Sequence, residues 1–117
     1  MSEWHDIASE QDVRRDGRVV ARIAGRELGV VVLEAGGELR AIRNRCPHHG
    51  APLCLGRVQE RLTGTPGSYV RSGRLTLRCP WHGWEFDLET GVCPDDESMR
   101  AAVYPVRVDA GRVLVQA

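Results

Sequence analysis

The chain has 117 residues, 42% of them hydrophobic, and its 16 basic and 16 acidic side chains give a formal net charge of zero. This length predicts a single domain over residues 1–117 with one modest core and no second catalytic domain. The balanced charge argues against nucleic acid and against an anionic membrane as partners, because no overall field would attract either.

The N-terminal residues lack the basic start and apolar core of a signal peptide, and apolar stretches such as residues 30–33 are far too short to span a bilayer. We therefore expect a cytoplasmic protein. All basic residues are arginine, and we attribute this to a coding bias of the genome in preference to a functional cause.

Short alternating apolar runs separated by glycine predict an all-β chain of antiparallel strands, since no helical periodicity persists. In chain order we first expect a hairpin whose strands, 18–23 and 27–34, are joined about residues 24–26, and then a turn at 35–37 that leads into a strand over 38–44. Further strands are expected over 74–78 and 84–88, followed by a turn at 89–91. A closing pair of strands, 101–109 and 112–116, is joined about residues 110–111.

Two segments each place one thiol and one imidazole within a tight turn: Cys46-Pro47-His48-His49-Gly50 and Cys79-Pro80-Trp81-His82-Gly83. The expected strands 38–44 and 74–78 run directly into these two segments. A zinc finger usually pairs Cys with Cys and His with His. A mixed pair in each loop suits a centre with one sulfur-ligated and one nitrogen-ligated metal.

These motifs resemble those of Rieske iron–sulfur proteins. The resemblance implies that Cys46 and Cys79 bind one iron of a 2Fe–2S cluster and that His48 and His82 bind the other. Zinc bound by the same four donors is the alternative.

The residues after the second motif indicate which branch of the family the chain resembles. High-potential Rieske proteins have a Ser and then a Tyr whose hydroxyls bond to cluster sulfur, whereas this chain has Trp84 and Phe86. Respiratory members also join their two loops by a disulfide, and Ala51 and Trp81 stand at those positions here. The resemblance is therefore to the low-potential, soluble Rieske ferredoxins of bacterial ring-hydroxylating oxygenases.

The family fold implied is a small antiparallel β-sandwich or open barrel with cluster loops at about residues 45–55 and 78–87. Gly50 and Gly83 suit backbone that approaches a cluster closely. The aromatic side chains expected to shield the cluster from water are Trp81, Trp84 and Phe86.

Other features have two interpretations each. Residues 56–73 are expected to be an insertion, either a plain surface hairpin or a loop that contacts a partner or covers the cluster.

His49 is either an exposed loop residue or a residue that contacts a redox partner. Residues 95–97 cap a solvated loop or serve in docking. Cys54 and Cys93 are buried thiols or, as the minority alternative, a disulfide.

The resemblance implies a one-electron carrier between a flavin-dependent reductase and a terminal oxygenase, monomeric when isolated and not an enzyme by itself. No histidine follows Gly83, so we expect no mononuclear-iron domain here and place any chemistry on substrate on another protein. The alternatives are the small subunit of a cytoplasmic nitrite reductase, and an interaction or sensor module with no fixed electron route.

Overall fold

A computed structural model of the chain describes residues 3–33 and 37–117 and confirms a small, mostly antiparallel all-β fold. In chain order the elements are β1 (Trp4–Ser9), α1 (Glu10–Asp16), β2 (Arg18–Ile23), β3 (Arg26–Val32), β4 (Leu39–Arg43), the 3-10 turn η1 (Leu53–Leu55), β5 (Arg57–Thr63), β6 (Val70–Arg78), β7 (Glu85–Asp87), β8 (Val92–Cys93), β9 (Asp96–Arg100), β10 (Val103–Tyr104), β11 (Val106–Asp109) and β12 (Arg112–Gln116).

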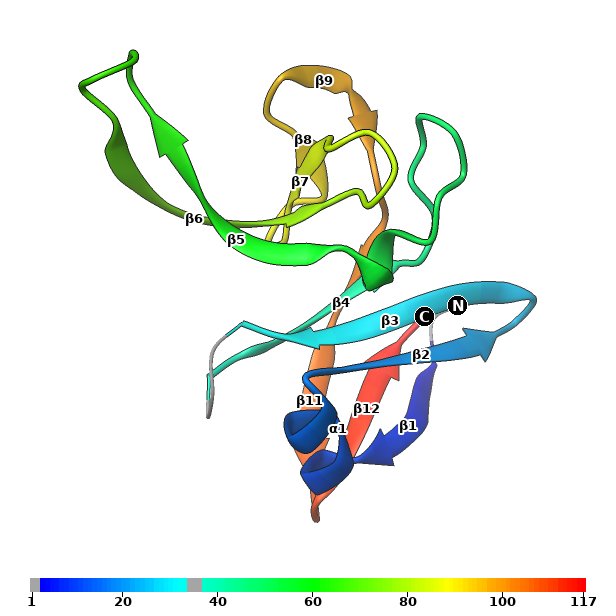
Figure 1. Cartoon of the computed structure of the whole chain (residues 1–117). Helices are drawn as coiled ribbons and strands as arrows, with labels where there is room; N and C mark the ends of the chain where they lie inside the picture. Colours follow the sequence, from blue (N-terminus) through cyan, green and yellow to red (C-terminus); the bar gives the residue numbers. More distant parts are fainter. Residues whose placement is uncertain (1–2, 34–36) are drawn as a thin grey trace.

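Two sheets form the lower half of the molecule in Figure 1, one ordered β10-β4-β3-β2 and the other β1-β12-β11. The predicted hairpin of β2 and β3 is confirmed, with Ile23 opposite Arg26 about a turn in which Ala24 and Gly25 both have positive φ. The turn predicted at 35–37 falls largely on residues 34–36, which lie outside the described residues. A core that includes Val30, Ala41 and Val113 fills the space between these sheets.

Strand β1 and the helix α1 were not expected from the sequence. The side chain of Ser9 accepts a hydrogen bond from the backbone N–H of Asp12 at the start of α1, and Gly17 ends the helix with φ 83°. Only Val13 of this seven-residue helix is buried. A helix with one buried position shows no periodic apolar stripe, which explains why the pattern did not reveal it.

The prediction of one closing strand over residues 101–109 is wrong in detail. The segment divides at Pro105 into β10, which pairs with β4, and β11, which pairs with β12. A proline has no backbone N–H to donate to a ladder, so the chain leaves one sheet and enters the other there.

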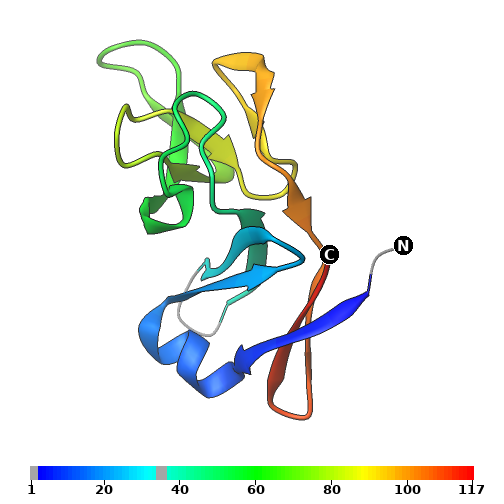
Figure 2. The same cartoon turned by 90° about the vertical axis from the view of Figure 1, so that its right-hand side faces the viewer.

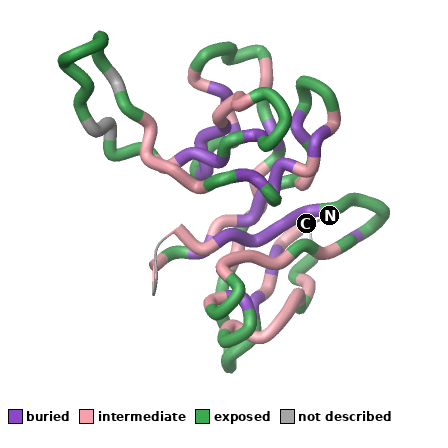
Figure 3. The backbone as a smooth tube through the Cα atoms, viewed as in Figure 1, coloured by how far each residue is buried: buried purple, intermediate pink, exposed green. Residues whose placement is uncertain are grey.

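The upper half contains the sheet β5-β6-β7 and the pair β8-β9, and it surrounds a second core, visible as buried chain in Figure 3. Ile42, Leu77 and Phe86 are among its fully buried residues. The guanidinium of Arg18 on β2 joins the two halves by donating to the carbonyls of Cys54 (2.7 Å) and Gly56 (2.8 Å).

The predicted insertion at 56–73 is a hairpin of β5 with the first part of β6, and it projects from the body as a long arm (Figure 1) that points away from the viewer in Figure 2. Its outer part exposes Leu62, Tyr69 and Val70, each more than half accessible. No helix among the described residues is long and apolar enough to cross a membrane.

Candidate metal centre

Strand β4 leads into the first loop, which a short hydrogen-bonded turn closes. The backbone N–H of Cys46 donates to the carbonyl of Ala51 (2.8 Å), and the N–H of Gly50 donates back to the carbonyl of Cys46 (2.7 Å). Gly50 has φ +76°, a left-handed conformation in which a side chain is strained. The guanidinium of Arg45 lies over this glycine.

Strand β6 leads into the second loop, which repeats the same pattern. The N–H of Cys79 donates to the carbonyl of Trp84 (2.7 Å), and the N–H of Gly83 donates to the carbonyl of Cys79 (3.1 Å). Gly83 has φ +75°, and the guanidinium of Arg78 lies beside it. The two loops therefore have matching backbone, and each holds its cysteine at the base and its histidine at the tip.

The two loop cysteines form a buried sulfur pair, since Cys46 is 1% exposed and Cys79 is 2% exposed. Burial raises the pKa of the Cys46 thiol, and the neighbouring Cys79 raises it further, while hydrogen bonds from the backbone of His48 and His49 lower it. A buried thiol with such an environment is ionised only when a cation compensates it. The pair thus fits a metal ligand set better than an inert core.

The histidines of both loops meet at the exposed tip. The ring centroids of His48 and His82 are 5.1 Å apart, and the ring of His49 lies 3.9 Å from His48 and 4.8 Å from His82. Desolvation lowers the pKa of His48, and the charges of His49 and His82 lower it further. A lowered pKa favours neutral imidazole, which is the form that binds metals.

The structure thus has buried thiols at the bases of both loops and exposed imidazoles at their tips. His49 is exposed beside His48 and His82, as the sequence indicated for a loop residue. Its place in a group of three imidazoles, in which one ring nitrogen of each lies within 4.8 Å of the others, was not foreseen.

The predicted aromatic shield is only partly present. Phe86 is fully buried, and Trp84 is half-buried with its ring 5.5 Å from that of His48. Trp81 is 58% exposed, so its ring is not part of the buried core. It stands two residues after Cys79, as His48 stands two residues after Cys46.

The remaining cysteines lie in the upper core. Cys54 and Cys93 are fully buried, and all four cysteines are free thiols. The Cys54 thiol donates to the carbonyl of Ile42 (3.5 Å), and burial raises its pKa to about 12. Cys54 is thus a core thiol that stays protonated.

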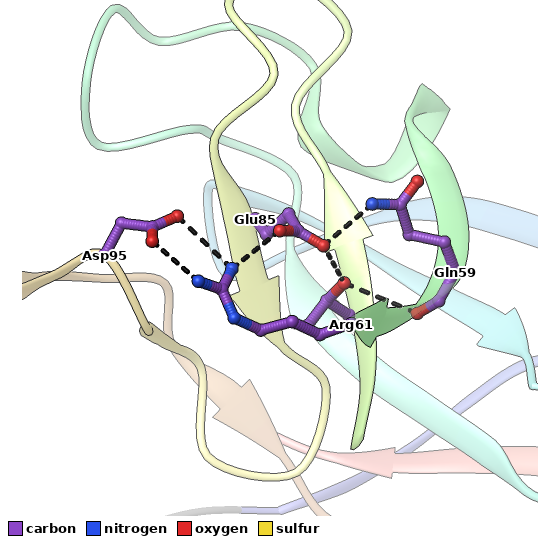
Figure 4. Close-up of polar contacts among 5 residues, drawn as sticks. Gln59, Arg61, Glu85 and Asp95 are labelled. Carbon is purple, nitrogen blue, oxygen red and sulfur yellow. Dashed lines mark hydrogen bonds and ion pairs between the residues drawn. The ribbon is translucent and has the colours of Figure 1, made fainter. Parts of the chain in front are cut away.

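A polar network holds the strand that leaves the second loop (Figure 4). The carboxylate of Glu85 accepts hydrogen bonds from Gln59 (2.7 Å), from the Thr76 hydroxyl (2.8 Å) and from Arg61 (2.7 Å). Arg61 also pairs with Asp95 at 2.6 Å. The acidic run at 95–97 thus binds the arm through Asp95, a role that sequence reasoning missed because Arg61 lies in the supposed insertion.

The donor set of two buried thiols and two exposed imidazoles on matching loops fits a cluster with one sulfur-ligated and one nitrogen-ligated iron. The chain is 33% identical over 122 residues to the oxygenase subunit of a 3-chlorobenzoate-3,4-dioxygenase from Comamonas testosteroni, covering 96% of this chain and 25% of that subunit. It is 31% identical over 118 residues to the ferredoxin subunit of an anthranilate 1,2-dioxygenase from Burkholderia cepacia, covering 98% of this chain and 93% of that subunit.

The chain thus spans about a quarter of the length of the oxygenase subunit and nearly the whole ferredoxin subunit. Among solved structures, it superimposes with a TM-score of 0.82 on a Mycobacterium tuberculosis protein assigned as the small subunit of an NADH-dependent nitrite reductase. That protein is 25% identical, and the match covers 100% of this chain and 96% of the other.

A family model described as the Rieske [2Fe-2S] domain matches residues 3–108, which include both loops and every strand up to the start of the last hairpin turn. This match agrees with the ferredoxin likeness and with the paired loops. The chain therefore belongs to the Rieske [2Fe-2S] family, whose members carry electrons on a Rieske-type 2Fe–2S cluster.

Proposed function

We propose that Cys46 and Cys79 hold one iron and His48 and His82 hold the other, and that the domain carries single electrons from a flavin-dependent reductase to a terminal oxygenase. On this proposal the domain catalyses no reaction of its own. The observation that carries it is the buried thiol pair beneath an exposed imidazole pair on two matching loops.

The bound cluster would supply a one-electron couple, and two neutral imidazoles in place of two thiolates make that couple easier to reduce than in a four-cysteine cluster. The protein's part is to hold the donors and to exclude water. Phe86 closes the inner side as a fully buried ring, and the exposed edges of His48 and His82 leave an outward path for the electron.

The choice of partner rests on two observations. The likeness to an anthranilate dioxygenase ferredoxin subunit extends over nearly the full length of both chains. Neither Trp84 nor Phe86 has a hydroxyl for the cluster, and this agrees with a low-potential carrier. The second candidate, the small subunit of a nitrite reductase, is favoured by the TM-score of 0.82 to a protein so assigned.

The ligand assignment is tested by electron paramagnetic resonance of the reduced protein, with iron and acid-labile sulfide measured on the same sample. We expect the low average g value of a His-ligated cluster and near-equal iron and sulfide. Cys46→Ser and Cys79→Ser should lose the signal, whereas the controls Cys54→Ser and Cys93→Ser should keep it. Colourless protein that holds only zinc after anaerobic purification would contradict the proposal.

The partner is tested by stopped-flow reduction of two acceptors by the reduced protein. We expect fast transfer to the terminal oxygenase of a neighbouring gene cluster and slow transfer to a nitrite reductase large subunit. The reverse order would favour the second candidate. Equal, negligible rates with both would favour the interaction or sensor alternative.

We also propose a cytoplasmic, monomeric carrier. Cys54 and Cys93, which are buried and not joined by a disulfide, agree with a reducing compartment. Light scattering of the purified protein should give the mass of one chain, and cell fractionation should recover it with the cytosol.

A further inference from the structure

We propose that an arginine-lined surface beside the first cluster loop docks a carboxylate-rich face of the redox partner protein. This inference rests on the proposed carrier function and adds the chemistry of the partner's contact surface. We call it the arginine surface, and its members are Arg22, Arg26, Arg43, Arg45 and Arg100.

Two neighbouring hollows make up the arginine surface. The first, of about 300 Å³, lies between the β2–β3 turn and the first loop. The second, of about 400 Å³, lies between the first loop and the end of β9. Arg43 and Arg45 line both hollows and thus form the ridge between them.

Positive charge on this surface is not neutralised by the protein itself. Its one acidic lining residue is Glu27, which lies 3.9 Å from Arg22 and accepts a hydrogen bond from Asn44. Arg26, Arg43 and Arg45 are exposed, and no carboxylate of the described residues forms an ion pair with them. Because the chain as a whole is neutral, this surplus is local.

The opposite end of the molecule shows the contrast. On α1, Arg14 pairs with Glu10 at 2.8 Å, and Arg15 pairs with Asp12 and Asp16 at 3.1 Å each. Arg112 on β12 likewise pairs with Asp6. No carboxylate of the described residues forms an ion pair with Arg107 on β11, whose guanidinium lies 4.3 Å from the centroid of the Trp4 ring. Arginines without a carboxylate partner are therefore more numerous beside the first loop than on α1, β11 and β12.

The arginine surface also adjoins the electron path. Gly50 and Pro52 line the first hollow, and Pro47 lines the second, so the hollows flank the loop whose tip carries His48 and His49. A partner bound there would lie against the exposed imidazoles. Complementary charge at such a position speeds the encounter and sets its orientation.

A protein face fits better than a nucleic acid. The lining of both hollows contains no aromatic side chain on which a base could stack. Arginine also binds carboxylates in a two-pronged geometry, and this suits aspartate and glutamate side chains on a folded surface.

The first test oxidises the reduced protein with hexacyanoferrate(III), which takes one electron from each protein molecule and becomes hexacyanoferrate(II). At low ionic strength we expect Arg26→Glu/Arg43→Glu to slow this reaction about tenfold. The cationic oxidant hexaammineruthenium(III) should react faster with the same variant. High salt should remove both effects.

The matched control is Arg15→Glu/Arg107→Glu, which changes the net charge equally on α1 and β11, at the far end of the molecule (Figure 1). It should change either rate by less than about twofold, because the Coulomb interaction with the oxidant at the loop tips weakens with distance. If the control slowed the reaction as much as the surface variant, net charge and not the arginine surface would be the cause, and the proposal would be wrong.

The second test titrates ¹⁵N-labelled protein with poly-L-glutamate. Amide shifts should move at the β2–β3 turn and at Ala102, and they should stay in place in Arg26→Glu/Arg43→Glu. A duplex DNA oligonucleotide that bound more tightly than poly-L-glutamate at the same salt would overturn the choice of partner.

Failure of the docking surface and failure of the carrier function are distinguishable. Wild-type protein without the Rieske resonance signal would contradict the carrier function, and poly-L-glutamate would still test the surface. A normal signal with unchanged rates in the surface variant would refute docking alone. Should the glutamate variant lose its cluster, Arg26→Gln/Arg43→Gln provides the same test with a smaller expected change.

Discussion

Two kinds of cysteine occur within nine residues of each other in this chain, and their surroundings separate them. Cys46 faces another thiol and the backbone N–H groups of its own loop. Cys54 faces the carbonyl of Ile42 and packs against Gly29, where an added β-carbon would collide with its sulfur. The first environment suits a ligand, and the second suits a small apolar side chain.

The Cys54 thiol should make stability depend on alkaline pH. Its pKa is about 12 in the folded protein and has an ordinary value of 9.0 in the unfolded chain. Only the unfolded chain loses this proton between those values, so the free energy of unfolding falls as pH rises, by at most about 1.4 kcal/mol per pH unit. Denaturant unfolding across this window should show a shallower fall in Cys54→Ala, and parallel curves would contradict the burial argument.

Gly29 should tolerate no side chain while Cys54 is present. Gly29→Ala would force an overpacked contact that costs about 1–3 kcal/mol of unfolding free energy. The double variant with Cys54→Ala should recover part of this loss, because the sulfur is then absent. A double-mutant cycle by urea unfolding measures the coupling, and additive losses would show that the strain lies elsewhere.

Phe86 provides the residue-scale test of tuning. Without hydroxyl donors to the cluster, the reduction potential should lie near the lower end of the Rieske span, roughly −150 mV. Phe86→Tyr should raise it if the new hydroxyl reaches a ligand sulfur, because a donor stabilises the more negative reduced state. Protein-film voltammetry decides this, and a wild-type potential well above zero would place the protein in the high-potential branch.

At the scale of elements, the arm and the second loop share one polar network. Glu85 on β7 and Arg61 on β5 are only 16% and 22% exposed at their side chains, and they lie 24 residues apart in sequence. This pair joins the base of the arm to the strand that leaves the cluster loop, so the arm belongs to the site's framework and is more than a surface insertion.

Arg61→Ala should destabilise the protein by about 1.5–3 kcal/mol, because it removes charge-assisted hydrogen bonds from a half-buried carboxylate. The control is Arg112→Ala, which breaks the exposed Asp6 pair and should destabilise the protein clearly less, because solvent screens an exposed ion pair. Thermal and urea unfolding compare the two. Equal losses would mean that the network adds nothing beyond a surface ion pair.

At the scale of the whole molecule, the protein has two separate hydrophobic cores, and only one of them contains the loop cysteines. The lower core lies among β1, β2, β3, β4, α1 and β12, and the upper core includes both loop cysteines. The cluster would therefore stabilise the upper half directly, and the lower half forms a base that depends less on metal.

Removal of iron should loosen the two halves unequally. We expect hydrogen exchange in the cluster-free protein to speed up by more than about tenfold in β6, β7 and η1, and to change little in β3 and β12. Exchange measured by mass spectrometry before and after chelation tests this. Uniform acceleration would show that the halves unfold as one unit.

The sequence predicted the residues of the candidate metal site more fully than it predicted the arrangement of the strands. The spacing of cysteine and histidine in two short motifs was enough to predict the four ligand candidates and the family, because a metal site imposes local and strict demands on residue type. Alternating apolar residues predicted most strands, since burying one face of a sheet leaves a period of two.

Tertiary structure alone decided what depends on distant partners. Trp81 and Phe86 are both aromatic, yet one is exposed at a loop tip and the other is fully buried, because burial depends on which elements surround a position. Arg61 meets Glu85, and exposed arginines from β2, β3 and β4 gather beside one loop, only once the chain folds. A short sequence motif determines which ligand residues a single turn carries. Contacts between residues far apart in sequence arise only from the packing of whole strands and helices.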